Sequence, residues 1–179
     1  MSEQPNQVLV LWTEIVGLLK DPSVCNAGAT EAQILKLSSV LGKELPASYR
    51  AFLKICDGLG AGGFMQLSPT PHSIEQMSRT LSNRAKLNIK SNRVTVFDAH
   101  SKASQAFGKW PSELLQISSC DDMGHAIDLE SGKIFFFDYI EGGHVKFQFE
   151  SFEELLKNTI ALFQSGEKGI FGGLISTNS

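Results

Sequence analysis

Cysteine is scarce in this chain and is not arranged for disulfide bonds or metal binding. The 179 residues include three cysteines, at positions 25, 56 and 120, and none of them forms a C-x-x-C pair. An odd number of widely spaced cysteines fits a reducing compartment better than a disulfide scaffold. The N-terminal sequence has no basic segment before its short apolar run, so we do not expect a signal peptide. The apolar runs are too short to span a bilayer. These absences predict a cytoplasmic protein.

Positive charge is also in short supply. The formal net charge is -3 and the isoelectric point is about 5.8, which argues against nucleic acid or an anionic membrane as the main ligand. The acids are unevenly distributed, because residues 121–154 hold nine Asp or Glu residues but only two Lys or Arg residues. This region is either an ordinary solvated surface or a contact for a basic partner.

The usual signatures of enzymes and cofactor sites are missing. The glycine-rich segment 58–63 lacks the Lys-Ser/Thr pair of a phosphate-binding loop and follows no expected strand, so we interpret it as a flexible connection. His125 with either Asp121 or Asp122 would supply only two metal ligands, too few for a dedicated site. No Ser or Cys nucleophile is tied to a histidine by a motif. We therefore expect no catalytic residue, cofactor or metal.

Helical periodicity dominates the first third of the chain. Apolar spacing predicts one helix over residues 6–20 and a second helix between Thr30 and Gly42. Thr30 begins a capping-box pattern, and Gly42 suits the left-handed residue that follows a helix. A third helix is expected to begin at Pro46 and to end at Gly58. The apolar stripes of these helices should form one side of a core.

The rest of the chain predicts mainly strands. Residues 72–90 are polar and partly helical in pattern, whereas residues 98–112 look irregular. Alternating apolar residues and turn signals predict strands over residues 64–67, 114–118, 124–129, 133–140 and 145–149. Residues 94–97 fit either a strand or a short buried turn. Ser151 begins the capping box of a final helix.

Turn lengths suggest how the last strands pair. A two-residue turn at Ser131-Gly132 would place His125 opposite Asp138. Another at Gly142-Gly143 would place Phe136 opposite Phe149. One face would then collect an apolar set that the final helix can cover: Ile127, Leu129, Ile134, Phe136, Ile140, Val145, Phe147 and Phe149. A His–Asp pair can belong to a catalytic site, but we favour a structural cross-strand pair.

The opposite face of these strands carries an alternating aromatic row. Either another layer covers the rings, or they form a partly exposed row rimmed by acids, which is typical of protein-binding surfaces. On the second interpretation, the predicted binding residues are Phe135, Phe137, Tyr139, Asp121, Asp122, Asp128 and Glu130.

The order of these elements resembles a known family. A tryptophan-bearing first helix is followed by ATEAQILKLSSVLGKELPASYRAFLKICDG, and later by ISSCDDMGHAIDLESGKIFFFDY and SFEELL. Over roughly residues 8–163 this set is similar to the SUKH superfamily of Smi/Knr-type proteins. The resemblance implies one α+β domain over residues 1–179, with an antiparallel β-sheet flanked by helices. The tail over residues 166–179 has little pattern, and we expect it to be flexible. Ser38 and Asp57 depart from the family pattern.

The resemblance also implies a function. Bacterial members are mostly immunity proteins that bind and neutralise a cognate secreted toxin, often a nuclease, and they are not enzymes. We therefore expect a cytoplasmic immunity protein whose partner is a protein toxin domain, with no direct contact to nucleic acid or membrane. The alternatives are a non-enzymatic regulatory module, such as a cell-wall synthesis regulator, and a small hydrolase that uses His125 and Asp138.

Overall fold

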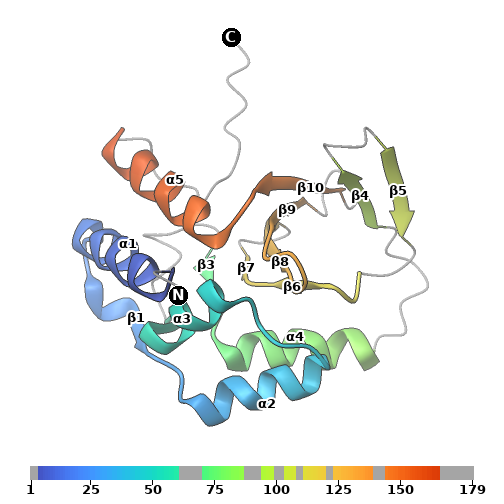
Figure 1. The fold of residues 1–179 in the computed structure, drawn as a ribbon, viewed down its shortest axis with the longest axis horizontal. Helices are drawn as coiled ribbons and strands as arrows, with labels where there is room; N and C mark the ends of the chain where they lie inside the picture. Colours follow the sequence, from blue (N-terminus) through green and yellow to red (C-terminus); the bar gives the residue numbers. More distant parts are fainter. Residues whose placement is uncertain are drawn as a thin grey trace.

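The computed structural model describes residues 4–60, 70–86, 94–98, 103–107, 111–119, 123–138 and 144–165. Within these ranges the chain has an α+β architecture (Figure 1). Its helices are α1 (Gln4–Leu18), a 3-10 turn (Pro22–Val24), α2 (Glu31–Leu41), α3 (Ala47–Ile55), α4 (Ile74–Lys86) and α5 (Phe152–Gln164). Its strands are β1 (Cys25–Ala27), β2 (Cys56–Leu59), β3 (Thr70–Pro71), β4 (Val94–Asp98), β5 (Ala103–Phe107), β6 (Leu114–Gln116), β7 (Ser118–Ser119), β8 (Met123–Asp128), β9 (Ile134–Asp138) and β10 (His144–Phe149).

One sheet organises most of the strands. Its six strands follow the order β5-β4-β10-β9-β8-β6, and every neighbouring pair is antiparallel except β10 with β4. Two small antiparallel pairs, β1-β2 and β3-β7, form separate sheets, and β7 lies beside β8. Figure 1 shows α1 and α5 side by side at one end of the molecule and the β4-β5 hairpin at the other. The predicted sheet flanked by helices is confirmed, with one parallel pair added.

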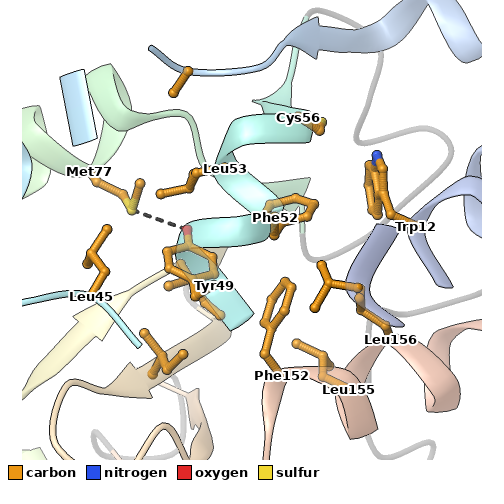
Figure 2. Packing of buried hydrophobic residues seen from close by; sticks show 14 of the residues in the cluster. Trp12, Leu45, Tyr49, Phe52, Leu53, Cys56, Met77, Phe152, Leu155 and Leu156 are labelled. Carbon is orange, nitrogen blue, oxygen red and sulfur yellow. Dashed lines mark hydrogen bonds between the residues drawn. The ribbon is translucent and has the colours of Figure 1, made fainter. Parts of the chain in front are cut away.

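The helical end of the core is built around aromatic rings (Figure 2). Trp12 of α1 meets Phe52 of α3 edge to face, with ring centroids 4.8 Å apart. Phe152 of α5 lies 5.1 Å from Phe52 and 5.2 Å from Tyr49. The Tyr49 hydroxyl donates to Met77 Sδ of α4 at 3.3 Å, so its polar tip has a partner inside the core. Four helices are thereby joined at one point.

The caps of the second helix form as predicted. Thr30 Oγ1 accepts the Gln33 N–H, and Gln33 Oε1 accepts the Thr30 N–H, which completes a capping box. Gly42 closes the helix in the left-handed region with φ of 66°. The buried side of this helix includes Ile34 and Leu37.

The predicted end of the third helix is wrong. The helix ends at Ile55, and residues Cys56–Leu59 form β2, which pairs with β1. Glycine is required at position 58, but not because a helix ends there. Its φ is +72°, and a Cβ added there would lie 2.5 Å from the backbone of His72 and Ser73. Glycine therefore permits a close approach of two chain segments.

Two other boundaries differ from the prediction. Residues 103–107, predicted to be irregular, form β5, which pairs with β4 along its whole length; the sequence Ala-Ser-Gln-Ala-Phe shows no alternating apolar pattern that would have indicated a strand. The strand predicted over residues 114–118 is interrupted at Ile117, because β6 pairs with β8 while β7 pairs with β3. The strand predicted over residues 64–67, the end of the 133–140 strand and the tail lie outside the described residues.

The turn between β8 and β9 is longer than predicted. The Asp128 N–H donates to the Lys133 carbonyl at 2.9 Å, and Asp128 Oδ1 accepts the N–H groups of Glu130 and Ser131. Pairing is therefore offset by two residues, and His125 lies opposite Phe136. Because side chains alternate with a period of two, this offset keeps each side chain on its predicted face.

The observed pairing of β9 with β10 differs from the predicted register by an odd number of residues. An odd offset changes the face to which the side chains point. Val145 lies opposite Phe137, and Phe147 lies opposite Phe135. These two β10 side chains therefore point to the face opposite the predicted one. Phe149, beyond a bulge, lies opposite Ile134 rather than Phe136.

Candidate protein-binding surface

The two faces of the six-stranded sheet bury different sets of side chains. On the helix-side face, Leu115, Ile127 and Ile134 belong to the same cluster as Phe152 and Leu155 of α5. On the opposite face, here called the outer face, a smaller cluster is buried, composed of Leu114, Ala126, Phe137 and Val145. Phe135 packs against this smaller cluster and is only half-buried. Part of the Phe135 ring therefore remains accessible on the outer face.

An aromatic pair occupies the accessible part of the outer face. Phe135 of β9 and Phe147 of β10 lie opposite each other, and their rings meet edge to face with centroids 6.0 Å apart. Lys133 Nζ lies 5.4 Å from the centroid of the Phe147 ring and 3.0 Å from Glu150 Oε2. The pair thus combines apolar ring surface with an ammonium and a carboxylate at its margin.

The other predicted aromatic residues have different positions. Phe137 is 1% exposed, so its ring belongs to the buried cluster and offers no contact surface. Its ring lies against Gly124, where an added Cβ would come within 2.9 Å of Phe137 Cζ. The opposing glycine thus leaves space for the ring. Tyr139, Asp121 and Asp122 lie outside the described residues.

The two predicted acids that the structure describes already have partners. Asp128 holds the β8-β9 turn through two backbone hydrogen bonds. Glu130 is 74% exposed and pairs with Lys43 at 2.6 Å. The hydrogen bond to Glu130, with the nearby charge of Glu113 and Asp128, raises the pKa of Lys43. Part of the acidic rim is therefore neutralised by a lysine from outside the sheet.

His125 is enclosed in the protein and does not pair with Asp138. Its side chain is 0% exposed, and its Nδ1 lies 3.0 Å from Ser118 Oγ, which also accepts the His125 backbone N–H. Burial lowers the pKa of His125 to about 3. The predicted His125–Asp138 pair is wrong because Asp138 lies opposite Met123.

This arrangement does not favour the hydrolase alternative. That interpretation required His125 to pair with Asp138, and the register separates them. Ser118 and His125 are enclosed, at 1% and 0% exposed, and Ser118 Oγ contacts His125 Nδ1 inside the protein. A second buried histidine, His72, makes a similar contact with Ser119 Oγ at 2.7 Å. Among the described residues, no three His, Cys, Asp or Glu side chains cluster so that they could hold a metal ion.

Phe147 and Lys133 were missed as members of this surface. A regular strand places residues i and i+2 on one face, so Phe147 and Phe149 were both predicted to be core residues. The alternation Phe-Gln-Phe gives no hint of a bulge.

Comparison with known proteins adds the family. In the described part of the chain, no helix is both long and apolar enough to cross a membrane. A search of curated proteins finds no match. Residues 28–158, well over half of the chain, match the SMI1 / KNR4 family (SUKH-1). This match begins directly after β1 and includes α2, α3, α4, β2 to β10 and the first half of α5. The chain therefore belongs to the SMI1 / KNR4 family (SUKH-1).

Proposed function

We propose that this protein is an immunity protein that neutralises a cognate secreted toxin domain by binding it directly. Membership in the SMI1 / KNR4 family supports an immunity or regulatory role, and a protein partner in general. The observation that carries the proposal is the aromatic pair of Phe135 and Phe147, half-exposed on a sheet face whose buried cluster lies beneath it. This surface is the proposed contact for the toxin.

The chemistry of the pair suits a tight interface. Binding energy at protein interfaces is concentrated in a few aromatic and arginine anchors surrounded by a polar rim. Phe135 and Phe147 are rigid rings fixed on two paired strands, so little conformational freedom is lost when a partner covers them. Lys133 and Glu150 supply rim groups that can exchange their mutual ion pair for contacts with the partner.

The acids give the surface a preferred type of partner. We include Asp121, Asp122, Asp128 and Glu130 in the proposed surface, because the first two precede β8 in sequence and the others form the turn that follows it. Tyr139, which follows β9, is included as a third aromatic anchor. A toxin that cleaves nucleic acid presents a basic active-site groove, and carboxylates can attract such a groove and speed association at low salt.

The test measures binding kinetics with the C-terminal domain of a secreted protein encoded beside this gene. Surface plasmon resonance at two salt concentrations would compare the wild type with Phe135→Leu and Tyr139→Ala. Each substitution removes a ring, and we expect faster dissociation equivalent to about 2 kcal/mol for an anchor. Asp121→Asn with Asp122→Asn should instead slow association and weaken its salt dependence.

A matched control separates this surface from general surface effects. Leu35 on α2 is 49% exposed and belongs to neither cluster of the sheet, so Leu35→Ala should leave both rate constants unchanged. Unchanged kinetics in all the surface variants would place the interface elsewhere, for example in the segment 58–112 or on α1, where Val10 is 59% exposed.

The second candidate is a regulatory module without a toxin partner, which the same family match supports. The two candidates differ in what the neighbouring genes should encode. A large secreted protein with a variable C-terminal domain beside this gene favours immunity, and rescue of growth when both are expressed would demonstrate it. A locus without such a gene favours the regulatory candidate.

A further inference from the structure

The start of α4 is held by two sets of hydrogen bonds, one local and one distant. Ser73 Oγ accepts the Gln76 N–H at 3.2 Å, and Gln76 Oε1 accepts the Ser73 N–H at 2.7 Å, which forms a capping box. The Ile74 N–H instead donates to Asp57 Oδ1 of β2 at 2.7 Å. The local bonds define where the helix begins in the sequence, whereas the bond to Asp57 ties that beginning to one place in the fold.

Asp57 is itself fixed by its neighbours. Its carbonyl oxygen accepts Asn26 Nδ2 of β1 at 2.8 Å, and its side chain is half-buried. The next residue, Gly58, packs so closely on the backbone of His72 and Ser73 that an added Cβ would lie 2.5 Å from it. A carboxylate at the first turn of a helix is also favoured by the helix dipole. The contacts of Asp57 and Gly58 with the start of α4 are here called the clasp.

Few side chains of α4 reach the core. Among residues 74–82, Ile74 and Met77 are buried and Leu81 is half-buried against the core, while the others are exposed or half-buried and polar. Met77 Sδ accepts the Tyr49 hydroxyl at 3.3 Å (Figure 2), and α4 lies beside α2 (Figure 1). Elements with few buried apolar contacts open at a lower free energy than the rest of a protein. The clasp is therefore a large part of what holds α4 in place.

We propose that α4 is a strap that opens separately from the rest of the core, and that Asp57 is the positioning residue whose carboxylate holds the strap closed. Opening would uncover the hydroxyl of Tyr49, while the rings of Trp12, Phe52 and Phe152 stay packed together. This motion belongs to the fold itself and does not depend on the proposed toxin contact.

Native-state hydrogen exchange, followed by nuclear magnetic resonance, tests whether α4 opens separately. In the wild type, the amides of α4 should exchange as a group and faster than the slowest amides of α1, α3 and α5. Ile15→Val weakens the core outside the clasp, so it should speed the slowest amides by about 2–10-fold and leave the α4 amides unchanged. Equal acceleration of both groups would show that α4 opens only with the whole protein and would overturn the proposal.

Substitutions at Asp57 test the clasp. Asp57→Ala removes the acceptor and should speed exchange of the α4 amides at least about tenfold. Asp57→Asn retains a side-chain oxygen, so its α4 amides should exchange within about threefold of the wild-type rate. Glu75→Gln is the matched control, because Glu75 is an exposed carboxylate of α4 that pairs with Arg79 of the same helix; it should also change the rate by less than about threefold. An unchanged rate in Asp57→Ala, or an equal acceleration by any of the three substitutions, would overturn the role of this hydrogen bond.

The wild-type protein supplies a further measurement if Asp57→Ala does not fold. Burial raises the pKa of Asp57; the hydrogen bond from Ile74 lowers it, and the charge of Glu75 raises it. The amide signal of Ile74 should therefore shift as the Asp57 carboxyl group titrates, and this shift should disappear in Asp57→Asn. Titration of Glu75 would persist in that variant, which separates the two carboxyl groups. An Ile74 signal that does not follow Asp57 would show that the two groups are not in contact and would overturn the proposal.

Discussion

The two faces of the six-stranded sheet are packed in different ways. The helix-side face meets rings from three helices, and Trp12, Phe52 and Phe152 are each at most 2% exposed. Among the described residues the outer face buries a much smaller set, and Phe135 and Phe147 are only half-buried there. Phe136 and Phe149 are half-buried at the margin of the helix-side face. Since burial of apolar surface is the main source of stability, we expect most of the free energy of folding to come from the helix-side core. Substitutions on the outer face should affect stability less, which leaves that face available for recognition.

The largest expected effect is at the centre of the helix-side core. Phe52 contacts the rings of Trp12, Tyr49 and Phe152, so Phe52→Ala should lower the free energy of unfolding by about 3–5 kcal/mol. Phe135→Ala, on the outer face, should lower it by clearly less. Urea denaturation followed by circular dichroism measures both values. Equal losses would mean that both faces contribute alike and would remove the contrast.

Acid should destabilise the protein through the buried His125. Its pKa is lowered to about 3 in the folded protein from the ordinary value of 6.5, so the folded state resists protonation that the unfolded state accepts. Stability is therefore greatest above pH 6.5 and declines as the pH falls, by about 2–3 kcal/mol between pH 6.5 and pH 4.5.

Comparison with a variant isolates this effect from other titrations. His125→Gln retains a polar side chain but cannot be protonated, so its free energy of unfolding should decline less over the same pH range. Chemical denaturation at half-unit pH steps would measure the difference. Parallel curves for the two proteins would show that His125 is protonated equally in both states and would contradict the enclosed position.

The helical half of the protein was largely predictable from its sequence because its signals are local. The Thr30 capping box and Gly42 each specify backbone geometry within a few residues, and apolar spacing identified the buried sides of the helices, including Tyr49 and Phe52. The error at Gly58 arose because its left-handed geometry serves a contact with the distant backbone of His72. A single sequence does not reveal such a long-range requirement.

The candidate surface was less predictable because it depends on register. The aromatic residues of β9 were identified, but their partners across the sheet were not. The length of the β8-β9 turn is set by hydrogen bonds of the Asp128 side chain, and the face of Phe147 is set by a bulge at Gln148. A change of one residue in pairing reverses every side chain of a strand. The length of one turn and the position of one bulge therefore determine which rings are exposed.

A substitution at Phe136 tests where the helix-side core ends. It was predicted to face Phe149 in the core, but it lies between His125 and Lys146 and is half-buried. Phe136→Ala should therefore lower the free energy of unfolding by about 1–2 kcal/mol, well below the effect of Phe52→Ala. The same denaturation experiment measures it. A loss as large as that of Phe52→Ala would show that the packed core continues along the whole helix-side face.

The smallest effect on stability is expected at the ion pair of Lys43 and Glu130. Both side chains are well exposed, at 36% and 74%, and exposed ion pairs contribute about 0–1 kcal/mol. Lys43→Gln should therefore change unfolding little, but it removes a positive charge that interacts with Glu130, Glu113 and Asp128. If a basic toxin docks at this side of the sheet, Lys43→Gln should speed association at low salt, while Glu130→Gln should slow it.

The two substitutions change the net charge in opposite directions at one site, so each serves as the control for the other. Association rates that shift in the same direction would indicate a structural disturbance, and rates that do not shift would exclude this rim from the approach of the partner.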